Sequence, residues 1–336
     1  MDTIRHGGAL GRAIATYGGE RGDWLDLSTG INPVAYPIPQ LDAAIWQRLP
    51  DESLMEDCLQ AARDYYDIPQ EAGVLAAPGT QAIIQWLPLL FNYLDRVSIV
   101  SPTYGEYAGV FRMTGVSVAT PGGLPDEPDA TDLLVVGQPN NPDGRTWPAD
   151  AILPFASGRR VAVVDEAFAD VAPEHSLVSR TGGRGLMVLR SFGKFFGLAG
   201  VRLGFAIGDP DVIAALQTMI GPWAVPGPAL AIGARAFRDR NWIADTRSRL
   251  ETDSARLAAM LERHGFTLIG RTGLFVTARH AAAGQVAHAL GRRHILVREF
   301  DHDAEWMRFG LPGMDHEFAR LDSALAETAA AMQNPR

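Results

Sequence analysis

The sequence predicts an α/β protein with a large, mostly parallel sheet domain and a smaller α+β C-terminal domain. Five short apolar runs are bounded by turn residues, and segments with helical periodicity lie between or beside them. Continuous apolar runs are typical of strands that helices cover on both faces. After about residue 226 the sequence changes to helical segments rich in Ala, Arg and Leu, with shorter strand candidates. The predicted fold class depends on these three observations.

The first element is an N-terminal arm, which we expect over residues 1–40 as part of the small domain and as a cover for the functional site. Its stretch PVAYPIPQL, residues 33–41, is rich in proline. Proline disfavours helix both at its own position and at the residue before it, so the arm should be extended there.

The large domain is predicted over residues 41–225. Its strand candidates are VSIV (97–100), LLVV (133–136), VAVV (161–164), LMVL (186–189) and LGFAI (203–207). Apolar spacing predicts helices over 81–91 and 209–220. Asp209 suits the N-cap of the second helix because its carboxylate can accept a free backbone N–H, and Pro210 suits the first helical position.

The small domain is predicted over residues 226–336. The stretch 248–265 has the periodicity of an amphipathic helix, and Gly265 is a typical residue for its C-terminal end. Short strands are expected at FTLI (266–269), LFVTA (274–278) and ILVRE (295–299).

Composition excludes several classes of protein. The 336-residue chain carries a formal charge of −9 and has no window rich in Lys or Arg, so no nucleic-acid partner is expected. It has no run of eighteen apolar residues and no apolar core of a signal peptide near its N-terminus, so we expect a cytoplasmic protein without a membrane partner. Cys58 is the only cysteine and the histidines lack HExxH spacing, so no metal site is expected.

Polar residues follow four of the predicted strands. The runs lead into SPTYGEY, GQPNNPDG, DEAF and RSFGK. In open α/β sheets ligands bind beyond the carboxyl ends of the strands, so these four segments are expected to form one site.

Two ionisable residues are central to that site. Lys194 lies among glycines and phenylalanines just after a buried strand, where an unpaired ammonium is unfavourable. On its own it is more often a lysine whose head reaches solvent. Asp165 ends another strand, where a carboxylate needs a cation such as a protonated pyridine nitrogen.

Three further features complete the prediction. Asn141 can donate from its amide to a phenolate oxygen, and Tyr104 can stack on a flat heterocycle, although a turn asparagine and a core tyrosine are the simpler interpretations. In APGTQAII, the backbone N–H groups of Gly79, Thr80 and Gln81 enter a helix and are expected to bind a phosphate. Flanking the lysine, Ser191 and Arg202 can complete this anion site. Together these parts suit pyridoxal 5'-phosphate.

The motifs PNNPDG, VVDEAF and SFGKFFGLAGVRLGF occur in the order and spacing of a known family. The chain resembles the fold type I pyridoxal-phosphate enzymes of the aminotransferase class over nearly its whole length. The resemblance implies that Lys194 forms a Schiff base with the cofactor, Asp165 holds the ring nitrogen and Asn141 bonds the ring oxygen. It also implies that Ser191 and Arg202 bind the cofactor phosphate, and that the protein is a homodimer with its site at the subunit interface.

Within this class the chain resembles the branch of L-threonine-O-3-phosphate decarboxylase and histidinol-phosphate aminotransferase. The opening RHGGALG resembles the decarboxylase's His-Gly-Gly, which implies that His6 and Gly7 bind substrate, and DLSTGINP places Asn32 near it. By the same resemblance, Arg298 and Arg308 bind the phosphate and carboxylate of a phosphorylated amino acid. A guanidinium fork suits both anions. Without the resemblance, they would be interpreted as one surface arginine and one salt-bridged arginine.

The reaction implied by the resemblance is decarboxylation of L-threonine O-3-phosphate to (R)-1-aminopropan-2-yl phosphate in cobalamin biosynthesis. Phe168 favours it, because many aminotransferases have tyrosine there. The alternative is an aminotransferase for histidinol phosphate or a related phosphorylated amino acid, which would hold the Cα–H bond rather than the carboxylate perpendicular to the cofactor ring. A non-enzymatic nucleotide-binding module is less favoured, because the Gly-x-Gly-x-x-Gly turn is missing.

Two positions depart from the family. Leu49 stands where many relatives have a tyrosine that reaches the partner subunit's cofactor phosphate, and Gly193 stands where aminotransferases often have a serine. We therefore expect neither of these hydrogen bonds in this protein.

Overall fold

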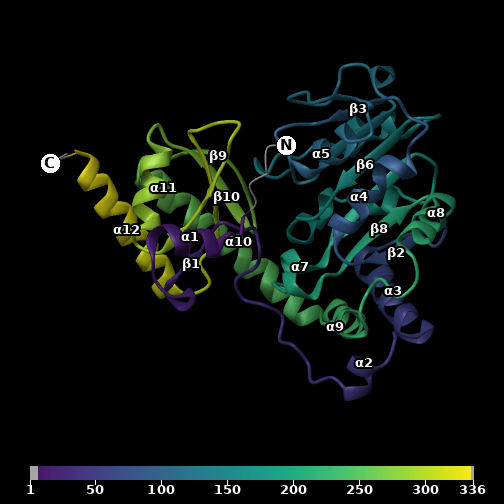
Figure 1. Ribbon diagram of the computed structural model, residues 1–336, viewed down its shortest axis with the longest axis horizontal. Coiled ribbons are helices and arrows are strands. Elements are labelled where there is room, and N and C mark those ends of the chain that lie inside the picture. Colours follow the sequence, from purple (N-terminus) through teal and green to yellow (C-terminus); the bar gives the residue numbers. More distant parts are fainter. Residues whose placement is uncertain (1–6, 334–336) are drawn as a thin grey trace. The chain divides into compact units, whose positions relative to one another are not determined.

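The computed structural model describes residues 7–333 and divides them into two compact units (Figure 1). The large unit comprises Ala35–Asn141 and Arg145–Ala244. The small unit comprises Pro142–Gly144 together with the described parts of Met1–Val34 and Asp245–Arg336.

A seven-stranded sheet forms the centre of the large unit. Its strand order is β2-β8-β7-β6-β5-β3-β4. The strand β8 runs antiparallel to β2 and β7, and the other six strands all run in one direction. The strands are β2 Gly73–Ala77, β3 Arg96–Ile99, β4 Ser117–Ala119, β5 Leu133–Gly137, β6 Val161–Asp165, β7 Leu186–Ser191 and β8 Gly204–Gly208. All five predicted runs are therefore strands, and the large, mostly parallel sheet is confirmed.

The helices of the large unit include both α-helices and short 3-10 turns. The α-helices are α2 Ala43–Gln47, α3 Glu52–Tyr66, α4 Thr80–Leu90, α5 Glu106–Arg112, α6 Ala149–Ile152, α7 Phe192–Phe195, α8 Pro210–Ile220 and α9 Gly227–Arg238, after which α10 Arg240–Arg263 begins. The 3-10 turns are η2 Pro128–Ala130, η3 Leu153–Ala156, η4 Ala169–Val171, η5 Pro173–His175, η6 Val178–Arg180 and η7 Ala199–Val201. As predicted, Asp209 caps α8 by accepting the backbone N–H of Asp211 at 2.9 Å.

The main core lies between the sheet and the helices α4, α5 and α8. Leu133, Leu134, Val135 and Val136 are each at most 1% exposed, so helices and loops cover both faces of β5. Burial of a Leu or Val side chain contributes about 1.5–3 kcal/mol relative to exposure, which explains why the continuous apolar runs become central strands.

The small unit contains two sheets. A four-stranded antiparallel sheet has the order β12-β13-β10-β9, and a two-stranded parallel sheet pairs β1 with β11. Its elements are α1 Leu10–Tyr17, η1 Arg21–Asp23, β1 Leu25–Asp26, β9 Thr267–Thr272, β10 Phe275–Arg279, α11 Ala283–Gly291, β11 Ile295–Leu296, β12 Arg298–Glu299, β13 Trp306–Gly310 and α12 Asp315–Gln333. The single strand expected at 295–299 is thus two strands that pair with different partners.

The units divide at residues 244 and 245, inside α10, whereas the expected boundary lay at 225 and 226. The helix α9 belongs to the large unit because it packs along α3, where the ring of Phe237 stacks on Tyr65 with centroids 5.0 Å apart. Cys58 lies in the same α3 and is fully buried, and burial raises the pKa of its thiol to about 12.

Candidate active site

The carboxyl edge of the large sheet brings together the polar segments that the sequence singled out. Asp165 is the last residue of β6 and Ser191 is the last residue of β7. Tyr104 follows β3, and Asn141 follows β5. Since β3, β5, β6 and β7 are parallel, the segments that follow them leave the sheet at one edge.

Asp165 is held by two hydrogen bonds. Its Oδ2 accepts the hydroxyl of Tyr107 at 2.9 Å, and its Oδ1 accepts the backbone N–H of Ala167 at 3.0 Å. Burial raises the pKa of Asp165, while these two donors and the positive charge of Lys194 lower it. The carboxylate is therefore oriented at the strand end, with the lysine close enough to act on its charge.

Lys194 lies in α7, one turn of helix that begins directly after Ser191. Its side chain is half-buried, and Nζ lies 5.8 Å from the centroid of the Phe168 ring. The neighbouring Gly193 leaves no room for the serine found in many aminotransferases, because a Cβ there would lie 2.7 Å from the Cα of Ala199. A tight turn thus positions the lysine.

The N-terminus of α4 forms an anion cradle with Arg202. Gly79 is the N-cap, with φ of +79°, and no side chain caps the helix. A Cβ on Gly79 would lie 2.6 Å from Nη2 of Arg202, so the guanidinium lies directly against the glycine. The N–H groups of Thr80 and Gln81 have no carbonyl one turn earlier to accept them. The N–H of Gly79 donates instead to the carbonyl of Ala77 at 2.7 Å, which leaves two of the three expected donors for a phosphate.

Tyr104 is fixed beside this cradle. Its hydroxyl donates to Oε1 of Gln81 at 2.9 Å, and Nε2 of Gln81 donates to Glu106 at 3.2 Å. Burial raises the pKa of Tyr104 to about 12, so the hydroxyl remains a donor at neutral pH. The side chain of Gln81 therefore orients the tyrosine, while its backbone N–H points out of the first turn of α4.

Asn140, which sequence reasoning passed over, holds the loop that carries Asn141. Its Nδ2 donates to the carbonyl of Pro102 at 2.9 Å, and its Oδ1 accepts the hydroxyl of Thr103 at 2.9 Å. Asn140 is fully buried and Asn141 is half-buried. Asn140 therefore fixes the loop, and the role of Asn141 toward the ring oxygen stays a prediction. Tyr107, which lies three residues after Tyr104 in SPTYGEY, was likewise assigned no role from the sequence.

The residues of the large unit fit pyridoxal 5'-phosphate. The uncapped helix N-terminus, the close approach of Arg202 and the hydroxyl of Ser191 suit the phosphate. Asp165 suits a protonated ring nitrogen, and Lys194 suits an aldehyde. This fit depends on the hydrogen-bond donors and charged groups of these residues. It also depends on Gly79, because a side chain at this position would collide with the Arg202 guanidinium.

The small unit places two of the predicted substrate residues side by side. Arg298 of β12 and Arg308 of β13 are directly opposite each other in the antiparallel register. Burial lowers the pKa of Arg308 to about 9, and the positive charge of Arg298 contributes to this lowering. Two neighbouring guanidinium groups, one of them buried, form a favourable site for an anion such as a phosphate or carboxylate.

Ser28 links the N-terminal segment to this pair of arginines. Arg308 Nη2 donates to the Ser28 carbonyl at 2.9 Å, and the N–H of Gly8 donates to its hydroxyl at 2.7 Å, which places Gly7 nearby. Asn32 is buried, and its Oδ1 accepts hydrogen bonds from the Val34 N–H and from Arg249 of α10. His6 lies outside the described residues.

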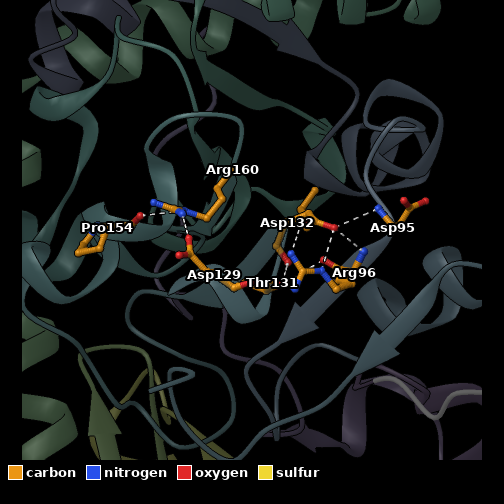
Figure 2. Close-up of polar contacts among 8 residues, drawn as sticks. Asp95, Arg96, Asp129, Thr131, Asp132, Pro154 and Arg160 are labelled. Carbon is orange, nitrogen blue, oxygen red and sulfur yellow. Dashed lines mark hydrogen bonds and ion pairs between the residues drawn. The ribbon is translucent and has the colours of Figure 1, made fainter. Parts of the chain in front are cut away.

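The amino edge of the large sheet carries a cavity and ion pairs, and none of the predicted site residues within the range 7–333 lines this cavity. A cavity of about 310 Å³ lies there, lined among others by Arg159, Arg160, Arg184 and Asp209. Nearby, Arg96 pairs with Asp132 at 2.6 Å and Arg160 pairs with Asp129 (Figure 2). This cavity is thus separate from the candidate site.

Every helix within residues 7–333 is too short or too polar to span a membrane. In the same range, no group of three or more His, Cys, Asp or Glu side chains is arranged to hold a metal ion.

The chain is similar to known proteins over nearly its whole length. A family model described as aminotransferase class I and II matches residues 25–321. Threonine-phosphate decarboxylase from Sinorhizobium sp. is 42% identical over 330 residues, which cover 96% of this chain and 98% of the relative. A protein of the same name from Pseudomonas aeruginosa is 41% identical over 328 residues, covering 96% and 97%.

A solved structure supports the fold independently. Histidinol-phosphate aminotransferase from Sinorhizobium meliloti, in complex with pyridoxal-5'-phosphate, superposes with a TM-score of 0.81 at 17% identity, covering 98% of this chain and 96% of that chain. At this identity the likeness shows the fold alone, and it confirms the predicted fold type I architecture.

Proposed function

The chain belongs to the aminotransferase class I and II family, and from this premise we propose that it decarboxylates L-threonine O-3-phosphate to (R)-1-aminopropan-2-yl phosphate in cobalamin biosynthesis. The observation that carries the proposal is the near full-length similarity to two proteins named threonine-phosphate decarboxylase. Membership of the family confirms the resemblance noted from the motifs and makes the chain a pyridoxal-phosphate-dependent enzyme. A non-enzymatic nucleotide-binding module is thereby excluded.

The cofactor supplies an aldehyde for the substrate's amino group and an electron-poor ring that accepts the electron pair released with carbon dioxide. We assign the cofactor phosphate to the N-terminus of α4, Arg202 and Ser191. We assign the ring nitrogen to Asp165, whose negative charge keeps that nitrogen protonated. The face of the ring is assigned to Tyr104 and the ring oxygen to Asn141.

Lys194 is assigned both the covalent attachment of the cofactor and a proton transfer. Its Nζ is a base when neutral and an acid when protonated, so it can return a proton to the substrate's α-carbon after the carboxylate has left. Because Asp165 is negative, it favours the ammonium form of Lys194, which is the form that donates the proton.

The substrate's two anionic groups are assigned to Arg298 and Arg308, with contributions from His6, Gly7 and Asn32. Fixing the phosphate and the carboxylate separately determines which bond to the α-carbon is oriented for cleavage. The opposed register of the two arginines supports this assignment, since each guanidinium can bind one anion.

The proposed reaction is tested with purified protein, pyridoxal phosphate and L-threonine O-3-phosphate. We expect one equivalent of carbon dioxide for each aminopropanyl phosphate formed, and no activity from Lys194→Ala. An oxo acid formed without carbon dioxide would instead identify an aminotransferase. Borohydride reduction followed by mass spectrometry should place a pyridoxyl group on Lys194.

We also propose that the protein is a cytoplasmic homodimer. Ile38, Trp46 and Leu49 of the large unit are each at least 66% exposed, and burial of such large apolar side chains by a second copy of the chain would be favourable. Light scattering of the purified protein should give twice the mass of the 36.3 kDa chain. Cell fractionation should recover the activity from the cytosol.

A further inference from the structure

We propose that Tyr107 is a positioning residue, which holds Asp165 in its ionised form and in one orientation toward the cofactor. This inference rests on the proposed function, because it assigns Asp165 to the ring nitrogen. Within residues 7–333, Tyr107 provides the only side-chain hydrogen bond to Asp165, at 2.9 Å. The other carboxylate oxygen accepts the Ala167 N–H, so each oxygen has one donor.

The chemistry explains why such a donor is needed. Burial alone favours the neutral acid, which cannot stabilise a positive ring nitrogen. A hydroxyl that donates to the carboxylate stabilises the ionised form instead. Tyr107 itself remains protonated, because burial and the charge of Asp165 raise its pKa well above the usual value.

The position of the Tyr107 hydroxyl is determined by the protein core. The residue lies in α5 and is 0% exposed, and its ring packs in the main hydrophobic cluster of the large unit. Tyr104, three residues earlier, meets it edge to face with centroids 6.3 Å apart. One short segment therefore supplies both the aromatic ring assigned to the cofactor face and the donor that orients the acid.

Other titratable groups also act on Asp165. Lys194 of α7 lowers its pKa, and Tyr104 lies close enough for its own pKa to be raised by the Asp165 charge. The neighbouring Glu166 is directed to Arg190 instead. Of these groups, Tyr107 alone combines full burial with a direct hydrogen bond, so its removal should change the ionisation of Asp165 without removing a charge.

The test compares Tyr107→Phe with Tyr66→Phe. The control removes the hydroxyl of a second buried tyrosine of the large unit, whose ring lies against Arg190, 4.3 Å from the guanidinium carbon. Dissociation constants for pyridoxal phosphate are measured by equilibrium dialysis from pH 5 to 9, with the absorption spectrum of the bound cofactor and the thermal midpoint.

We expect Tyr107→Phe to weaken cofactor binding at least tenfold at neutral pH, the size typical of a lost hydrogen bond to a charged group. Losing the donor raises the pKa of Asp165, so binding should recover as the pH rises and the low-pH limb of the profile, which depends on ionised Asp165, should move to higher pH. Tyr66→Phe should leave the profile in place.

Equal cofactor affinity and equal pH profiles in the two variants would overturn the inference and make Tyr107 a packing residue. A double-mutant cycle adds a second criterion. In the Asp165→Asn background, Tyr107→Phe should cause no further loss of affinity, and a full additional loss would contradict the proposal. If the wild-type protein bound no pyridoxal phosphate at all, the proposed function would fail instead.

Discussion

The two edges of the large sheet each carry a network of arginines and carboxylates, and the networks differ in burial rather than in distance. At the carboxyl edge, Arg190 is 2% exposed and contacts Glu166 at 2.7 Å and Asp170 at 3.2 Å. At the amino edge, Arg96 contacts Asp132 (Figure 2). This contact is 2.6 Å long, but the two side chains are 54% and 26% exposed.

This difference determines what each network contributes. Water screens the exposed pairs, so they contribute little to stability. In the buried network, Glu166 also accepts the Ser176 hydroxyl and the Leu177 N–H, and although burial opposes the charge of Arg190, Asp170 and Glu166 together raise its pKa. A buried charge that loses its partner is strongly unfavourable.

The buried network also lies next to the candidate site along the chain. Glu166 follows Asp165, and Arg190 precedes Ser191. The pair therefore joins the ends of β6 and β7 through side chains that are buried. At the amino edge, by contrast, Arg96 at the start of β3 pairs with Asp132, just before β5. Arg160, just before β6, pairs with Asp129 of η2.

The largest effect is expected from Arg190→Met. The substitution leaves Glu166 and Asp170 buried without their cation, and we expect the free energy of unfolding to fall by about 3–5 kcal/mol. The shift of the urea midpoint, followed by circular dichroism, measures it. Arg159→Met, at an exposed arginine, is the matched control and should change little. A similar small change in both variants would show that burial does not distinguish the two edges.

An intermediate effect is expected from Asp165→Asn. Burial raises the pKa of Asp165 above its unfolded value of about 3.9, so the wild-type protein without cofactor loses stability as the pH rises from about 4 through the folded pKa. The variant should lose less stability over that range. Its affinity for pyridoxal phosphate should nevertheless fall by about tenfold to a hundredfold.

Urea midpoints measured across pH, together with cofactor dissociation constants, check both parts of this prediction. A variant that binds the cofactor as tightly as the wild type would argue against the role assigned to Asp165.

The smallest effect is expected from Asp132→Asn, below about 1 kcal/mol. Hydrogen bonds from Arg96 lower the pKa of Asp132, so its contribution is present above pH 4 and is lost as the pH falls through the lower folded pKa. It should also disappear in 1 M salt, whereas the effect of Arg190→Met should persist. Asp129, 88% exposed, provides a second variant in Asp129→Asn, which should leave the midpoint unchanged. A salt-resistant loss at Asp132 would contradict this comparison.

Much of the large sheet follows from the sequence, because its central strands are continuous apolar runs. Four strands of the protein were not predicted, one of which is the two-residue β1. The Ala-rich β2 has weak strand propensity, β4 has only three residues, of which the first and last are exposed, and β13 carries Arg308 within an apolar stretch. They are strands because neighbouring strands satisfy their backbone groups, and this pairing is a long-range property.

The candidate site was also only partly predictable from the local sequence. Local sequence determined that Asp165 ends a strand and that Tyr104, Asn141 and Lys194 come shortly after strand ends, because a buried parallel strand must end where its apolar run ends. The hydrogen bond of Tyr107 to Asp165, the anchoring role of Asn140 and the partners of Arg190 depend on contacts between distant segments. Only the tertiary structure decided these, since packing against other elements sets both the burial of a charge and the donors that reach it.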